Sequence, residues 1–256
     1  MVNDTDDHRI YAIGDIHGCL DQLLQVQDNI RSDLQKRPHP QPVIVYLGDF
    51  IDRGPESRGV VENLIIESAA AHRTHVLLGN HDMMLQIYLK DPTIPIRPNR
   101  PKVNKVHWLH ELGGGAETLL SYGVVDANHE NPGATHKDFI AALPGEHLHF
   151  FETLEHYVRL GSYLFVHAGI NPDAPLDEQT EDDFTWMREP FLSSTADHGF
   201  TVVHGHTPTK LVANRGNRIG IDTGAVFGGD LSCLVLEGTE QALLSQIGLI
   251  PCLPET

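Results

Sequence analysis

Five short apolar runs in this chain each end in a glycine-containing turn that carries aspartate, asparagine or histidine. The runs YAI, VIVYL, HVLL, YLFV and TVV precede GDIHG, GDFIDRG, GNHD, HAG and HGHT, respectively. Apolar runs of this length, bounded by turn residues, predict buried β-strands. The polar residues then lie where the strands end, which is the edge at which open α/β sheets bind ligands. The chain is therefore restricted to folds that gather several strand ends around one site.

The spacing of apolar residues predicts the order of strands and helices. We expect strands at 10–13, 43–47, 75–78, 163–166, 201–203 and 231–236, and helices at 20–34 and 58–71. Strand–helix–strand alternation near the N-terminus predicts parallel pairing with right-handed crossovers. The C-terminal part, with short strands between turns, predicts a meander. Together these patterns predict an α/β fold in which two packed sheets are flanked by helices.

Residues 91–155 interrupt the alternation, and we expect them to form a helical insertion or lid on a single domain of residues 1–256. The insertion opens with the proline-rich stretch DPTIPIRPNRPK, which predicts extended backbone. Helices are expected at 106–112, 116–121 and 137–143, with a glycine break at 113–115.

The proline-rich stretch and the residues after it also concentrate positive charge in an acidic chain. The four basic side chains are Arg97, Arg100, Lys102 and Lys105. One interpretation is that they lie at the rim of the cleft and attract an anionic substrate. The alternative is that they keep an exposed loop solvated.

Composition excludes several classes of protein. Lysine and arginine total 18 against 35 aspartate and glutamate, a net charge of −17 that argues against nucleic-acid partners. No apolar run approaches the length of a membrane span, and MVNDTDDHR is not a secretory signal, so no membrane partner is expected. Three cysteines without a C-x-x-C pair suit a reducing compartment, and we expect a cytoplasmic protein.

Six of the residues at strand ends are candidate metal ligands. They are Asp15, His17, Asp49, Asn80, His167 and His206. Oxygen and imidazole donors without thiolates suit manganese, iron or zinc. Carboxylates and histidines in this number are enough for two cations that share one carboxylate. Two metal ions about 3.5–4 Å apart can activate a water and hold both oxygens of an in-line displacement at phosphorus.

The motifs GDIHG, GDFIDRG, GNHD, HAG and GHT, in this order, resemble the calcineurin-like metallophosphoesterase superfamily. More narrowly, they resemble the bacterial and phage serine/threonine protein phosphatases of its PPP type. The resemblance spans about residues 10–235 and implies a four-layer αββα sandwich with a dinuclear metal centre. It implies that Asp15 and His17 hold the first metal, that Asn80, His167 and His206 hold the second, and that Asp49 bridges them.

The same resemblance implies roles for four further residues. His81 is the implied general acid, which protonates the leaving oxygen, and Asp52 orients it. Arg53 is implied to bind the phosphoryl group, and so is Arg188, which lies in a segment similar to a W-x-R-E motif. No serine or cysteine nucleophile stands near the motifs, so the expected reaction is direct attack of a metal-bridging hydroxide on phosphorus.

The function favoured by the sequence is hydrolysis of phosphomonoesters, above all phosphoserine and phosphothreonine on proteins, with two divalent metal ions, manganese first. The alternative is a symmetrical diadenosine tetraphosphate hydrolase, because residues 222–231 resemble the D-T-G-x-x-x-G-G-x-L segment of those enzymes. The expected partner is accordingly a phosphorylated protein or a small phosphorylated substrate. A metal-free binding module is a third alternative, disfavoured because the implied ligand set is complete.

Overall fold

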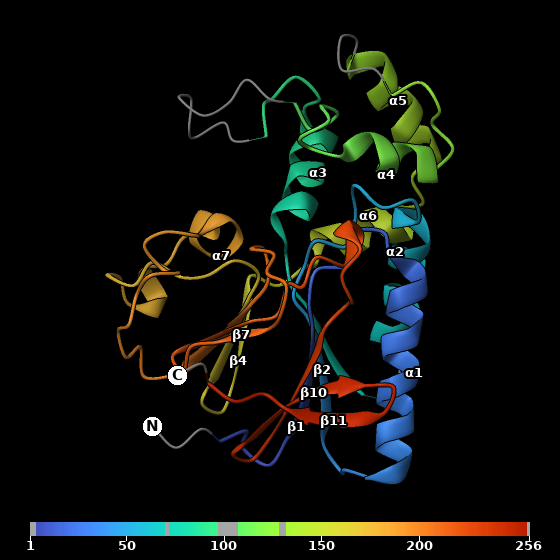
Figure 1. Ribbon diagram of the computed structural model, residues 1–256. Helices are drawn as coiled ribbons and strands as arrows, with labels where there is room; N and C mark the ends of the chain where they lie inside the picture. Colours follow the sequence, from blue (N-terminus) through green and yellow to red (C-terminus); the bar gives the residue numbers. More distant parts are fainter. Residues whose placement is uncertain (1–3, 70–71, 97–106, 128–131, 255–256) are drawn as a thin grey trace.

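The computed structural model describes residues 4–69, 72–96, 107–127 and 132–254, and it places the strands in two sheets (Figure 1). Within these residues, the first sheet has six strands in the order β11-β10-β9-β1-β2-β3, and the second has five in the order β4-β5-β6-β8-β7. The strands are β1 (Arg9–Ile13), β2 (Pro42–Tyr46), β3 (Arg73–Val76), β4 (Tyr157–Leu160), β5 (Tyr163–Val166), β6 (Thr201–His204), β7 (Ala213–Asn214), β8 (Arg218–Gly220), β9 (Cys233–Glu237), β10 (Glu240–Ser245) and β11 (Gly248–Pro251).

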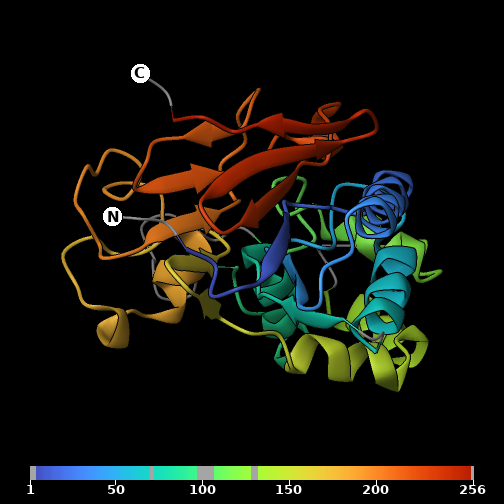
Figure 2. The same cartoon turned by 90° about the horizontal axis from the view of Figure 1, so that it is seen from below.

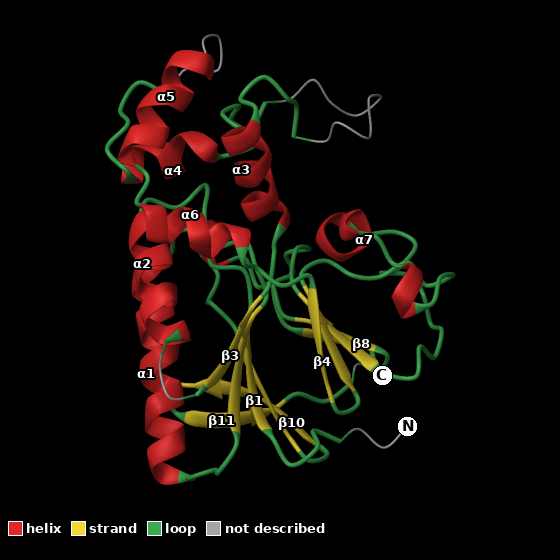
Figure 3. Cartoon of the chain, turned by 180° about the vertical axis from the view of Figure 1, so that it is seen from behind, coloured by secondary structure: helices red, strands yellow, loops and turns green. Residues whose placement is uncertain are grey.

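Helices cover the outer faces and the top of the two sheets (Figures 1 and 3). They are α1 (Leu20–Lys36), α2 (Ser57–Ser68), α3 (Asn80–Lys90), α4 (Gly115–Ser121), α5 (Pro132–Ala142), α6 (Gly145–Glu152) and α7 (Glu181–Trp186), with short 3-10 helices η1 (Leu176–Glu178) and η2 (Ala225–Phe227). No helix in the described part of the chain is long and apolar enough to cross a membrane.

Strand pairing follows the predicted pattern in the first sheet, but the C-terminal part, which was predicted to be a meander, also contains the parallel pair β6–β8. The strands β1, β2 and β3 pair in parallel, with Ile10 opposite Val43 and Val45 opposite His75. The strands β9, β10 and β11 pair antiparallel, as expected of a C-terminal meander. In the second sheet, β5, β6 and β8 are parallel, and the edge strands β4 and β7 run antiparallel to their neighbours.

Both sheets are buried on two faces, which explains why the central strands are apolar throughout. Along β1, Ile10 and Ala12 pack into the core between the sheets, whereas Tyr11 and Ile13 pack into the core beneath α1 and α2. On the far side, the outer face of the second sheet packs against Phe184 of α7. Figure 2, which looks along the layers, shows the two sheets between these helices. The predicted four-layer αββα sandwich is confirmed.

The prediction of a helix at 106–112 is wrong for residues 107–112, the part of this range that the structure describes. Residues 107–113 form turns instead. Here the Trp108 side chain is buried, and its carbonyl oxygen accepts the N–H of Gly115. A Cβ on Gly113 would lie 2.2 Å from the Trp108 carbonyl oxygen, so the chain folds back on itself too tightly for a helix. Helix α5 starts before the predicted 137–143 segment, and α6 was not expected. The basic segment Arg97–Lys105 lies outside the described residues.

Candidate metal centre and active site

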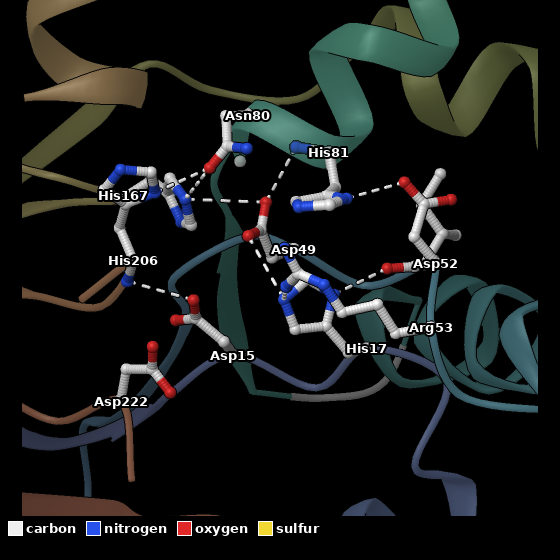
Figure 4. Close-up of polar contacts among 12 residues, drawn as sticks. Asp15, His17, Asp49, Asp52, Arg53, Asn80, His81, His167, His206 and Asp222 are labelled. Atoms are coloured by element: carbon white, nitrogen blue, oxygen red, sulfur yellow. Dashed lines mark hydrogen bonds and ion pairs between the residues drawn. The ribbon is translucent and has the colours of Figure 1, made fainter. Parts of the chain in front are cut away.

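The candidate site is built on turns whose backbone enters the left-handed region. The φ angles are +45° at His17, +53° at Asp49, +72° at Asp52, +67° at Arg53 and +63° at His206. Such a conformation costs a non-glycine residue about 1–3 kcal/mol, and residues of this kind cluster at functional sites. These sharp turns at the ends of strands direct side chains from both sheets into one region (Figure 4).

Asp49 lies at the centre of this region and is buried. Its Oδ2 lies 3.4 Å from His17 Nε2, and its Oδ1 lies 3.4 Å from His167 Nε2. The turn that holds Asp49 is itself fixed by Asp82 of α3, whose Oδ2 accepts the Asp49 N–H at 2.8 Å and the Gly79 N–H at 3.0 Å. A Cβ on Gly79 would lie 2.2 Å from the Asp49 nitrogen, so only glycine fits there. One carboxylate thus stands between two imidazoles.

Two histidines present an unprotonated Nε2 to the centre. The Nδ1–H of His17 donates to the Ile51 carbonyl at 2.8 Å, and the Nδ1–H of His167 donates to the Leu47 carbonyl at 2.9 Å. Burial lowers the pKa of both imidazoles, that of His17 to about 3. Neutral rings anchored through Nδ1 carry a lone pair on Nε2, which is the form in which histidine binds metals.

Asn80 lies against the second pair of histidines. Its Oδ1 is 3.0 Å from His167 Nε2 and 2.6 Å from His206 Nδ1. Burial lowers the pKa of His206 well below its usual value, so this ring is neutral as well. In the described residues, two groups of ligand atoms lie within 4.8 Å of one another, namely His17, Asp49 and His81, and Asp49, His167 and His206. Asp49 belongs to both groups, as expected of a bridging ligand.

Asp15 completes the set of donors with an unsatisfied carboxylate. Its Oδ2 accepts the His206 N–H at 2.9 Å, but its buried Oδ1 has no hydrogen-bond partner among the described residues. Burial, Asp222 and Asp49 together raise the pKa of Asp15 well above its usual value. Figure 4 shows Asp222 beside Asp15. Burial raises the pKa of Asp222 to about 6, and its Oδ1 accepts the Gly224 N–H at 2.9 Å.

This arrangement of donors suits divalent cations. Neutral imidazoles, an amide oxygen and closely spaced carboxylates converge on one point. Among them lies the buried Oδ1 of Asp15, which has no hydrogen-bond partner among the described residues. A bound cation would supply the positive charge that these groups lack and would favour the ionised carboxylates. The donors are nitrogen and oxygen atoms, which suits manganese, iron or zinc. The residues present therefore fit the metal centre that the sequence implies.

A second network lies behind His81. The His81 Nδ1–H donates to Asp52 Oδ2 at 2.6 Å, and the Trp108 Nε1–H donates to the same oxygen at 2.8 Å. The Thr118 hydroxyl donates to Asp52 Oδ1 at 2.6 Å and accepts the Asp52 N–H at 2.9 Å. Asp52 is fully buried, so these bonds fix its carboxylate and, through it, the orientation of the His81 ring. Trp108 and Thr118 lie within residues 91–155, the segment expected to be an insertion.

The cluster opens into a cavity of about 240 Å³. Arg53 and Arg188 line this cavity, and Arg53 Nη1 donates to His17 Nε2 at 2.5 Å. Glu189 accepts a bond from the Ser193 hydroxyl. Asp183, at the N3 position of α7, accepts the N–H of the N-cap residue Thr180 at 2.9 Å. The rest of the cavity wall is largely apolar, and includes Met84, Ile96, Leu112, Trp186, Pro208, Ala225, Val226 and Phe227.

The structure brings the ten predicted residues into this one region, and their chemical roles stay predictions. Eight line the cavity, whereas His167 lies behind Asn80 and Asp52 behind His81. Four further residues of this region were assigned no role from the sequence, namely Asp82, Asp222, Trp108 and Thr118. Only Asp82 had a local signal, because it stands at the N3 position of α3, where a carboxylate caps the helix.

Comparison with known proteins defines the class. The chain belongs to the calcineurin-like phosphoesterase family, whose sequence profile matches residues 8–227. It is 26% identical to a symmetrical bis(5'-nucleosyl)-tetraphosphatase of Neisseria gonorrhoeae, over 90% of this chain and 93% of the relative. It is 30% identical to serine/threonine-protein phosphatase 1 of Salmonella typhimurium, over 87% and 89%. The crystal structure of a candidate diadenosine tetraphosphatase superposes with a TM-score of 0.61 at 23% identity, over 99% of both chains.

Proposed function

We propose that this protein is a metal-dependent hydrolase that cleaves the phosphoanhydride chain of dinucleoside polyphosphates. The observation that carries the proposal is the composition of the cavity. Its lining combines the buried donors and two arginines, which suit a phosphate chain, with apolar side chains, which suit a nucleoside. The segment 222–231, which resembles tetraphosphate hydrolases, supplies part of that apolar wall.

The proposed metal ligands are the six residues that the sequence indicated: Asp15, His17, Asp49, Asn80, His167 and His206. Divalent metal ions held there, manganese first, would activate water and neutralise negative charge on the phosphate. Asp49 is the proposed shared ligand because it contacts histidines on both sides. Asp82 holds the backbone of its turn in place.

The remaining proposed roles belong to side chains that contact the phosphate or the leaving group. Arg53 and Arg188 donate N–H groups to the phosphoryl oxygens. His81 donates the proton that the leaving oxygen takes up, because its Nδ1 is bound to Asp52, which leaves Nε2 to carry that proton, and the residue lines the cavity. Asp52 fixes the tautomer and the ring orientation of His81.

A second candidate function is hydrolysis of phosphoserine or phosphothreonine on proteins, which the sequence analysis favoured. Two observations support it, namely the 30% identity to a serine/threonine-protein phosphatase and the position of Arg188 in the cavity wall. A cytoplasmic location also stays a prediction, and the three free cysteines agree with it.

A substrate panel with manganese present separates these candidates. Diadenosine tetraphosphate, a phosphoserine peptide and an aryl phosphate are compared by kcat/KM, and nucleotide products are resolved by ion-exchange chromatography. Two molecules of ADP indicate symmetrical cleavage. The variant Asp49→Asn should abolish turnover, whereas Asp177→Asn, an exposed aspartate of η1, should not change it. A kcat/KM for the peptide well above that for the dinucleotide would refute the first candidate in favour of the second.

A further inference from the structure

Phe227 is an exposed apolar side chain that lines the cavity that holds the proposed metal ligands. Its side chain is 67% exposed, at the end of η2. Single exposed apolar residues are common on protein surfaces, so exposure alone assigns no function. Leu112, which is 71% exposed, lines the same cavity. The cavity therefore offers exposed apolar surface next to its charged groups.

The backbone beneath Phe227 is fixed rather than loose. Asp222 Oδ1 accepts the Gly224 N–H at 2.9 Å, and the Gly224 carbonyl accepts the Phe227 N–H at 2.8 Å. Gln22 of α1 ties the end of the segment to the core, since its Oε1 accepts the Leu231 N–H at 2.6 Å. Gly224, in the left-handed region at φ +70°, makes the turn possible. An exposed ring on a fixed backbone is pre-organised for a ligand.

Arg53 connects this ring to the proposed phosphate site. Its guanidinium carbon lies 5.6 Å from the centroid of the Phe227 ring, within the range of a cation–π contact. The same guanidinium donates to His17 Nε2. A phosphate bound by Arg53 would therefore lie beside an exposed aromatic face. A substrate in which a phosphate chain continues into a planar aromatic group matches this order of contacts.

We propose that Phe227 is a specificity-determining residue on which one nucleobase of the substrate stacks while Arg53 binds the adjoining phosphate. This inference rests on the proposed hydrolysis of dinucleoside polyphosphates and identifies the part of the substrate that the apolar wall recognises. Stacking on an aromatic side chain tolerates any base, because every base has a π-face. The ring therefore selects for nucleotides over bare polyphosphates, without selecting among the bases.

The test compares the parent protein with the Phe227→Ala and Phe227→Trp variants. Each protein is assayed on substrates with and without a nucleobase. Phe227→Ala should raise KM about tenfold for diadenosine tetraphosphate, equivalent to about 1.4 kcal/mol, and leave KM for inorganic tripolyphosphate within about twofold. Phe227→Trp should restore the parent KM, because it restores an aromatic face. The inhibition constant of AMP against tripolyphosphate hydrolysis should rise in parallel, while that of inorganic phosphate should not. The control Ile247→Ala removes a 93% exposed apolar side chain from the β10–β11 turn and should change nothing.

The outcomes separate this inference from the proposed function. A parent protein that cleaves tripolyphosphate or a phosphoserine peptide, but no dinucleotide, would overturn both. Parent activity on diadenosine tetraphosphate with an unchanged KM in Phe227→Ala would overturn the stacking role alone. The role would also be overturned by an equal rise in KM for tripolyphosphate. A larger rise for the phosphoserine peptide than for the dinucleotide would show that the ring binds a peptide.

Discussion

The hydroxyl of Thr118 provides a sharp test of how the His81–Asp52 pair is held. Thr118→Val preserves the shape of the side chain but removes the donor to Asp52 Oδ1 and one acceptor of the Asp52 N–H, which the Ser57 hydroxyl also accepts at 3.2 Å. A hydrogen bond to a charged group contributes about 1.5–3 kcal/mol. For a chain of this size, each kcal/mol shifts Tm by about 2–4 °C. We therefore expect Tm to fall by about 3–12 °C.

The catalytic effect should be smaller and depend on the leaving group. Trp108 and His81 still contact Asp52 Oδ2 in this variant, so the carboxylate keeps part of its orientation. We expect kcat for a phosphoserine peptide to fall about tenfold, which corresponds to about 1.4 kcal/mol of barrier. Hydrolysis of an aryl phosphate, whose leaving oxygen needs little protonation, should change less than about threefold.

The measurements are thermal unfolding and steady-state kinetics on both substrates, with Thr201→Val as the control. Thr201, the first residue of β6, is also buried. Its hydroxyl donates to the neutral carbonyl of Gly216. The control should lose stability without any change in kcat. A large fall in Tm with unchanged kcat on both substrates would make Thr118 a purely structural residue. An unchanged Tm would refute the assigned strength of its bond to Asp52.

Three further predictions concern the metals, the acid and the folded state. Calorimetric titration with Mn²⁺ should give two sites per chain, and Asp49→Asn should reduce this to one or none; a single site in the parent would refute the shared-ligand assignment. His81→Asn should keep the metal content but lower kcat about 10²–10⁴-fold on phosphoserine, with a smaller loss on dinucleotides; equal losses would remove its role as acid. The hydrogen bond from Arg9 lowers the pKa of Glu237. The stabilisation from this bond is therefore present at neutral pH and is lost as acid protonates the Glu237 carboxylate. The Tm difference between parent and Glu237→Gln should stay constant from pH 7 to about pH 5 and shrink as the pH falls below the ordinary pKa of glutamate, about 4.3; a difference that stays constant below that pH would contradict this linkage.

The sequence was sufficient for the strands that precede the motifs, for the layers and for the gathering of the candidate residues in one region, because each depends on local signals. The role of those residues as metal ligands stays a prediction. An apolar run followed by a glycine-rich turn identifies a strand and its end from about ten consecutive residues. Parallel strands then bring such turns to one edge of the sheet. The residues that hold Asp52 had no such signal. Trp108 and Thr118 meet Asp52 across more than fifty positions of sequence, and nothing near them indicates that contact.

The incorrect prediction of a helix at 106–112 also arises because contacts distant in the sequence determine the structure there. The apolar spacing of this range suits a helix, but local propensity is a weak influence beside burial of a tryptophan. In the fold, burial of Trp108 and its hydrogen bond to Asp52 determine the backbone. The close approach of Gly113 to Trp108 then requires a turn. Asp222 had no sequence signal beyond the resemblance of residues 222–231 to tetraphosphate hydrolases, since its place beside Asp15 depends on how the two sheets pack.

The left-handed turns have a consequence for how this chain can change over generations. Glycine adopts that conformation without strain, so a glycine at Arg53, whose side chain is not fully buried, would relieve a backbone cost of about 1 kcal/mol or more. A lineage that no longer needed the reaction would gain thermal stability by drifting to glycine there. Few mutations both raise stability and destroy activity so directly. Non-glycine residues at five such turns therefore argue, on energetic grounds, that the chemistry of this cavity is still in use, and they weigh against a metal-free binding module.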